Sequence, residues 1–155
     1  MFSASEILDI AIQIEENGEH FYREAMTKFS DQPLQEMLFW FAEQEKCHRE
    51  FFIKMKSSLH LGGEDRWAEQ LSGALLRGGL ADHLFSMDEV DLDAIRDVRT
   101  FCQIAIDLEQ DTVMFYEIIA SFVTDSNTLE QLMAIINEER KHIELFRERQ
   151  LSLGG

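Results

Sequence analysis

The sequence predicts an all-α protein, a four-helix bundle made of two repeated antiparallel helix hairpins joined by a long crossover. Apolar residues recur at helical spacing in four long segments, and no segment shows the alternation of a strand. The chain of 155 residues contains one proline and eight glycines, and every glycine except Gly18 lies between residues 62 and 79 or at the C-terminus. Little therefore interrupts the four segments, and a chain of this length is expected to form one domain over residues 1–155.

The first hairpin contains two helices separated by a short break. Ser3 or Ser5 can cap a helix that runs to about Phe29. The break between them is Ser30-Asp31-Gln32-Pro33. Its proline suits the first turn of the following helix. That second helix is expected to end near Leu59.

The second hairpin has the same design. A third helix should start near Asp88 or Asp91 and run to about Val123. Thr124-Asp125-Ser126-Asn127 ends it and caps the fourth helix. Because the breaks inside each pair are short, each pair should be antiparallel. The expected first hairpin, crossover and second hairpin are residues 3–59, 60–87 and 88–150.

The crossover is long enough to run the length of a bundle. Trp67-Ala68-Glu69-Gln70-Leu71, followed by Leu75-Leu76, could form a short helix laid over it. Gly62-Gly63 and Gly78-Gly79 would be its hinges.

The charge of the chain argues against two classes of partner. Acidic residues outnumber basic ones 30 to 14, and the net charge of -16 is repelled by phosphate backbones and anionic lipid surfaces. We therefore expect neither nucleic-acid nor membrane binding. Cys47 and Cys102 form no Cys-x-x-Cys pair, which excludes a thiolate metal site. With an acidic N-terminus and no apolar run of 18 residues, the expected location is the cytoplasm.

The two hairpins match each other without gaps at an offset of 94 residues. Apolar residues recur, as any two amphipathic hairpins would allow, but so do chemically reactive ones. Duplication is the simplest cause. The repeated reactive pairs are Glu15 with Glu109, Glu45 with Glu139, and His48 with His142.

Each hairpin contains one Glu-x-x-His sequence. Residues three apart share a helix face, so Glu45 and His48 should point the same way, as should Glu139 and His142. These faces also carry large apolar residues and should be buried. Glu15 and Glu109 lie in the middle of the apolar faces of the other two helices, which brings four carboxylates toward one core.

Four buried carboxylates without cations would cost several kcal/mol each, and no Lys or Arg shares those faces. Two divalent ions would balance the four negative charges, and two imidazoles would complete the ligand set. Di-iron and di-manganese carboxylate bundles have this arrangement, in which two helices each contribute one Glu and the other two each contribute a Glu-x-x-His sequence. The sequence does not choose between iron and manganese.

The chain resembles the ferritin-like superfamily, and most closely its rubrerythrin-like branch. The resemblance covers both hairpins and implies that Glu45 and Glu139 bridge the metals, that Glu15 and Glu109 are terminal ligands, and that His48 and His142 each bind one metal. It also implies iron, redox chemistry with dioxygen or hydrogen peroxide, and a dimer. No catalytic residue beyond the ligands is expected.

Two departures from that family matter. Rubrerythrins carry a rubredoxin domain with paired Cys-x-x-Cys motifs, which this chain lacks, so electrons should come from a separate donor protein. They also carry an extra glutamate one turn past the third-helix ligand, where this chain has Thr112. The resemblance therefore implies a symmetric ligand set, closer to that of bacterioferritin-type ferroxidase centres.

Several other residues allow two interpretations. Tyr22 and Tyr116 lie two turns from Glu15 and Glu109 and could donate hydrogen bonds to them, or could be ordinary core residues. Three histidines are expected to be solvated, namely His20, His60 and His83. Both cysteines are expected to be reduced packing residues. A second apolar stripe on the second helix could be covered by the crossover or form a homodimer interface, and it consists of Met37, Trp40, Cys47 and Phe51.

The sequence thus predicts a rubrerythrin-like oxidoreductase with two iron ions, or manganese ions, per chain, of peroxidase or ferroxidase type. A second class of function is iron handling, in which ferrous ion is oxidised for storage or delivery. A third is a metal-free helical interaction protein. The number of irons per chain separates the first two classes, since far more than two would favour storage. Metal analysis of Glu45→Ala and Glu139→Ala beside wild type tests the third.

Overall fold

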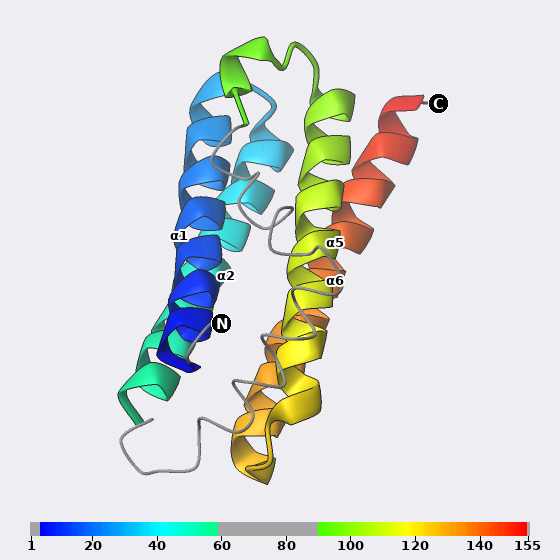
Figure 1. Cartoon of the computed structure of the whole chain (residues 1–155). Coiled ribbons are helices and arrows are strands. Elements are labelled where there is room, and N and C mark those ends of the chain that lie inside the picture. The colour runs from blue at the N-terminus through cyan, green and yellow to red at the C-terminus, as the bar shows by residue number, and fades with distance from the viewer. Residues whose placement is uncertain (1–3, 59–89, 155) are drawn as a thin grey trace. The chain divides into compact units, whose positions relative to one another are not determined.

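A computed structural model describes residues 4–58 and 90–154 of the chain (Figure 1). In these residues the secondary structure is entirely helical. The long helices pack as two hairpins, α1 against α2 and α5 against α6, and each hairpin belongs to a separate compact unit. The expected crossover, with its short helix near Trp67, lies outside the described residues.

Helices α1 (Ala4–Lys28) and α2 (Gln32–Ser57) form the first hairpin. Asp31 is the N-cap of α2, and its carboxylate accepts a hydrogen bond of 3.1 Å from the backbone N–H of Leu34. Pro33 occupies the first turn, as predicted. Because α1 already includes Ser5, that residue cannot be its N-cap, and Ser3 lies outside the described residues.

The buried face of α1 follows the predicted apolar periodicity and includes one carboxylate. It consists of Ala4, Ile7, Leu8, Ala11, Ile14, Glu15, Gly18, Phe21, Tyr22 and Ala25. The buried residues of α2 are Leu34, Leu38, Phe41, Ala42, Glu45, His48 and Phe52. Each helix therefore brings predicted ligands into its own apolar stripe.

The position predicted for the start of the third helix is wrong. A short 3-10 helix, η3 (Leu92–Ala94), is capped by Asp91 and is followed by Ile95 in an extended conformation. Helix α5 (Val98–Phe122) begins only after a second cap, Asp97, whose carboxylate accepts from the backbone N–H of Thr100 at 2.8 Å. Two aspartates six residues apart each cap a helix, so the chain forms two elements where one was expected.

Helix α6 (Ser126–Gly154) completes the second hairpin and extends a few residues beyond the predicted end. Asp125 caps it, accepting from both the backbone N–H and the hydroxyl of Thr128, at 2.9 and 2.7 Å. The buried residues of α6 are Leu132, Ile135, Ile136, Glu139, His142, Ile143 and Phe146. The second hairpin thus repeats the first, with a carboxylate and a histidine inside the apolar stripe.

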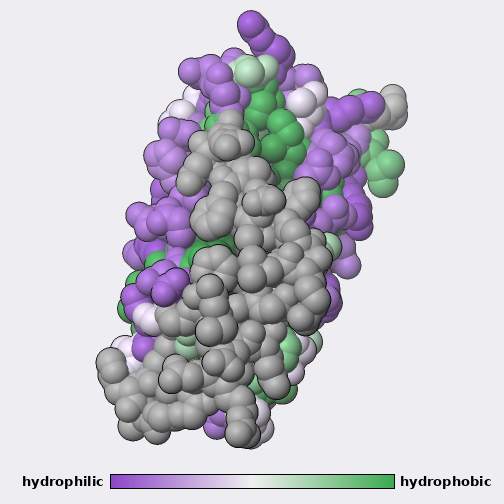
Figure 2. All heavy atoms as spheres, viewed as in Figure 1, coloured by the Kyte–Doolittle hydropathy of each residue, from purple (hydrophilic) through white to green (hydrophobic). Residues whose placement is uncertain are grey.

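The outer surface of the described helices is mostly hydrophilic on the face that Figure 2 shows. No helix in the described part of the chain is long and apolar enough to cross a membrane. Several large apolar side chains are nevertheless exposed, three of them on α2, namely Phe39, Trp40 and Ile53.

Candidate metal centre

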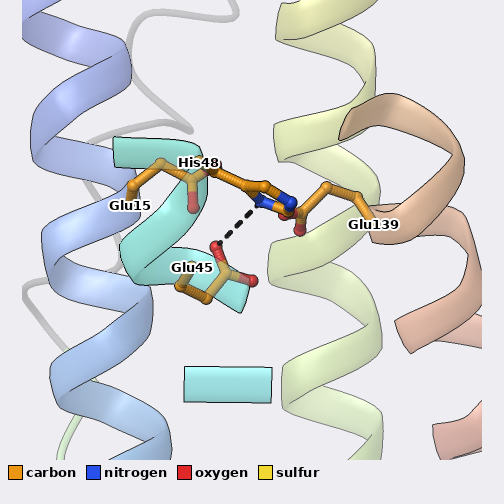
Figure 3. A group of neighbouring side chains, drawn as sticks. All are labelled: Glu15, Glu45, His48 and Glu139. Carbon is orange, nitrogen blue, oxygen red and sulfur yellow. Dashed lines mark ion pairs between the residues drawn. The ribbon is translucent and has the colours of Figure 1, made fainter. Parts of the chain in front are cut away.

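The first hairpin gathers three of the six predicted ligands. Glu15 comes from α1, and Glu45 and His48 come from successive turns of α2 (Figure 3). Nδ1 of His48 lies 3.6 Å from Oε1 of Glu15 and 3.9 Å from Oε2 of Glu45. One potential ligand atom of each residue, a carboxylate oxygen or an imidazole nitrogen, lies within 4.8 Å of the corresponding atoms of the other two. The three side chains are therefore close enough to share one metal ion.

The second hairpin repeats this geometry. Nδ1 of His142 lies 3.6 Å from Oε1 of Glu109 and 3.8 Å from Oε2 of Glu139. Ligand atoms of these three residues also lie within 4.8 Å of one another. In both hairpins the glutamate of the first helix is level with the Glu-x-x-His turn of the second, because equal numbers of residues lead to and from the short break.

All six side chains are buried, each with a relative exposure of 2% or less. Among the described residues, the buried polar set contains these six and Thr112, and no lysine or arginine. Each hairpin thus buries two carboxylates and one imidazole. A protonated imidazole could compensate one carboxylate, whereas a divalent ion compensates both and leaves the imidazole as a neutral ligand. The donor set fits a first-row divalent metal such as iron or manganese.

The residues one turn past Glu15 and Glu109 differ between the hairpins. Gly18 lies against the side chain of Glu45, and a β-carbon placed on Gly18 would be 3.5 Å from both Cδ and Oε2 of that glutamate. The equivalent residue, Thr112, is buried, and its hydroxyl donates to the carbonyl of Leu108 at 3.0 Å. The two groups therefore contain the same glutamate and histidine donors but differ in the residue that lies next to them.

The two predicted hydrogen-bond donors, Tyr22 and Tyr116, are both buried. The ring of Tyr22 packs on Phe21 and Phe41, with centroids 5.6 and 5.8 Å apart. Tyr116 packs on Phe115 at 5.9 Å. These contacts fix the rings in the apolar stripes, and donation by the hydroxyls to the ligand carboxylates stays a prediction.

The remaining candidates divide between surface and interior. His20 is exposed and lies 3.0 Å from Glu24, in agreement with the expectation of a solvated histidine, whereas His60 and His83 lie outside the described residues. Both cysteines are free thiols. Cys102 is buried as predicted, and burial raises the pKa of its thiol to about 11.

The prediction of a packing role is wrong for Cys47, which is exposed, because it faces away from the buried stripe of α2. Trp40, from the same second apolar stripe, exposes 60% of its surface. A homodimer interface on this stripe stays a prediction.

A network of ion pairs beside the ligands was not predicted. Glu19 of α1 accepts from Arg49 of α2 at 2.5 Å and from Arg23 at 2.8 Å, and Arg23 also contacts Glu43 of α2 at 3.1 Å. Burial raises the pKa of the Glu19 carboxyl, but the hydrogen bonds from Arg23 and Arg49 lower it by more, so this pKa lies below its usual value. The only local signal was the spacing of Glu19 and Arg23 by four residues.

The chain is similar to known proteins both in sequence family and in fold. The family model described as Rubrerythrin matches residues 6–149. A solved structure from Thermotoga maritima, described as a candidate ferritin-like diiron-carboxylate protein, superposes with a TM-score of 0.73 at 23% identity, covering 96% of this chain and 95% of that one. No curated protein matches.

The structural similarity shows the fold, and the predicted ferritin-like four-helix bundle is confirmed. The family model covers nearly the whole described chain, including every predicted ligand. The chain therefore belongs to the rubrerythrin family.

Proposed function

We propose that this protein is a non-haem redox protein that holds two iron ions, or two manganese ions, and reacts with dioxygen or hydrogen peroxide. The observation that carries the proposal is the repeated buried group of two glutamates and one histidine, with the same 3.6 Å approach of histidine to glutamate in both hairpins. Membership of the rubrerythrin family supports it.

Each ligand has a role in this proposal. Glu15, Glu45 and His48 would hold one ion in the first hairpin, and Glu109, Glu139 and His142 would hold one ion in the second. The apolar residues around these groups exclude bulk water, so the carboxylates stay positioned without competing solvent. Neutral imidazoles keep the donor set from adding further charge.

When bound, the two ions supply the electrons that reduce the oxidant. The chain has two cysteines and no Cys-x-x-Cys pair, so a separate donor protein would return those electrons. Tyr22 and Tyr116, buried two turns from Glu15 and Glu109, would orient the terminal carboxylates if their hydroxyls donate to them.

A second candidate is iron oxidation for storage or delivery. The observation that favours it is the net charge of -16, which attracts ferrous ions to the surface. In that case iron would be the substrate as well as the resident metal. The two candidates share the same ligands and differ in how much iron passes through them.

The experiment is metal analysis of the protein purified without added metal, together with its visible spectrum. The proposal expects about two ions per chain in the wild type and a clear loss in Glu45→Ala and Glu139→Ala. Glu50→Ala and Glu144→Ala are matched controls, because these glutamates also repeat between the hairpins but are exposed. Equal metal content in all five proteins would contradict the proposal.

Iron stoichiometry under aerobic loading then separates the two candidates. About two irons per chain with rapid turnover of peroxide or dioxygen supports the redox enzyme. Retention of many more irons per chain supports storage. Turnover should follow metal content across the same set of variants.

A further inference from the structure

Gly18 is the only glycine within the described residues other than that at the end of α6, and it lies in the middle of α1. Glycine inside a helix is unfavourable because its unfolded chain loses more conformational freedom than that of alanine. No turn or bend explains it here, since α1 is a continuous helix from Ala4 to Lys28. The presence of glycine at this position should therefore be explained by the residues that surround it.

Those surroundings are the side chain of Glu45. The three atoms nearest to a β-carbon on Gly18 would be Cδ and Oε2 of Glu45, both at 3.5 Å, and Cγ at 3.6 Å. All three belong to the ligand side chain and none to the backbone of α2. Close approach of two helix backbones is thus not what the glycine allows. Its missing side chain leaves space beside a carboxylate.

The second hairpin fills the equivalent position. Thr112 is buried, and its hydroxyl is bonded to the carbonyl of Leu108, one turn back in the same helix. A residue with a branched side chain is therefore compatible with this position in a ferritin-like hairpin. The space next to Glu45 is a property of the first hairpin and not a requirement of the repeat.

We propose that Gly18 is a positioning residue, which leaves the Glu45 carboxylate the freedom to take up the orientation that metal binding requires. The proposal rests on the proposed function. Oxygen ligands must lie within a few tenths of an ångström of their ideal distance from a metal ion. A methyl group in contact with both Cδ and Oε2 would close one side of the space through which this carboxylate turns.

This role separates two effects that usually change together. A β-carbon at 3.5 Å makes ordinary van der Waals contact, so alanine fits at this position without displacing the backbone. Gly18→Ala should therefore stabilise the metal-free protein through its helix propensity. The same methyl group should weaken metal binding, because it restricts Glu45.

The test compares Gly18→Ala with wild type in two measurements on metal-free protein. Its thermal midpoint should rise by about 1 to 4 °C. In a calorimetric titration with Co²⁺ alone, the affinity for one of the two ions should fall by about 10- to 100-fold. Thr112→Ala is the matched control, because it places the same side chain at the equivalent position of α5 but fills no empty space. It should keep both affinities within about threefold of wild type, a change too small to indicate a lost interaction.

Three results would overturn the inference. If Gly18→Ala binds both Co²⁺ ions as tightly as wild type, Gly18 does not position Glu45, and the proposed function is unaffected. If metal-free Gly18→Ala is less stable than wild type, the methyl group disturbs packing in general and the space was not free. If wild type itself binds no Co²⁺, the proposed function fails, and this role for Gly18 fails with it.

Discussion

The two hairpins agree at the ligands and differ one turn away. In the first, Glu19 and Arg49 join α1 to α2 through an ion pair of 2.5 Å. The residues at the same positions of the second hairpin are Val113 and Ile143, which are apolar and buried. Equivalent positions of the two hairpins thus carry an ion pair in the first and buried apolar residues in the second.

This difference shows which positions are interchangeable. Contacts that only hold two helices together can be ionic or apolar, because several kinds of interaction provide similar net stability. The glutamate and histidine groups are identical in both hairpins, and their distances agree within 0.1 Å, at 3.6 and 3.6 Å and at 3.9 and 3.8 Å. The repeat keeps the glutamates and histidines that we propose bind the metal ions.

The largest expected effect tests whether the two apolar stripes contribute equally. Phe52 and Phe146 are equivalent in the repeat and both fully buried. Replacing either by alanine leaves a cavity and should lower the free energy of unfolding by about 3–5 kcal/mol, as measured by urea denaturation. Phe39→Ala is the control, because Phe39 is 50% exposed and its loss should change stability by less than about 0.5 kcal/mol. Losses that differ by more than about 2 kcal/mol between the two variants would show that the hairpins are energetically unequal.

The next effect concerns the equivalence of the two ligand groups. His48→Ala and His142→Ala each remove one of three donors in a hairpin. Each should reduce the affinity for one metal ion by at least about 100-fold, or roughly 2.7 kcal/mol, and leave about one ion per chain. His20→Ala should retain both ions, since His20 is exposed. If either ligand variant loses both ions, the two groups do not bind independently.

The close approach of these glutamates and histidines within each hairpin could be predicted from the sequence because its signals are local. A spacing of three residues places Glu45 and His48 on one helix face whatever else the chain does, and the repeat identifies the second copy. The antiparallel pairing within each hairpin follows from the short break between its helices. In the first hairpin this break includes Asp31, the N-cap of α2. These features depend only on neighbours along the chain.

Other features depend on competition between neighbours or on contacts between helices. Asp91 and Asp97 are both good helix caps, and only the folded chain shows that the first caps a 3-10 turn and the second caps α5. The pairing of Glu19 with Arg49 joins residues 30 positions apart, and no local pattern indicates it. The exposure of Cys47 likewise depends on which side of α2 is covered.

A smaller effect should come from replacing the ion pair of the first hairpin by the apolar residues found at the same positions of the second. Glu19→Val should lower stability by about 1–2 kcal/mol, because it leaves the partly buried Arg49 without this partner. Arg49→Ile should lower it by about 1 kcal/mol, because Glu19 keeps its ion pair with Arg23. The double variant copies Val113 and Ile143 and should lose less than the sum of the two, with a coupling of about 1–2 kcal/mol in a double-mutant cycle. Additive losses would mean that the ion pair contributes nothing specific to the hairpin.

The smallest effect compares the caps of α2 and α6. Asp125 accepts hydrogen bonds from the hydroxyl and the backbone N–H of Thr128, and these lower the pKa of its carboxyl below the ordinary 3.8. At the equivalent position the first hairpin has Leu34, which offers only its backbone N–H to Asp31. Because the folded-state pKa of Asp125 is lowered, its charged form stabilises the protein above about pH 4, and this stabilisation is lost as the pH falls through the folded-state pKa.

Thr128→Val should therefore move the pKa of Asp125 upward in an NMR titration and lower the thermal midpoint slightly at pH 7. The midpoints of variant and wild type should converge once the pH falls below the folded-state pKa of Asp125, since protonation removes most of what the hydroxyl contributes. A difference that persists unchanged at low pH would assign the contribution of Thr128 to packing, and the two caps would then be equivalent in their electrostatics.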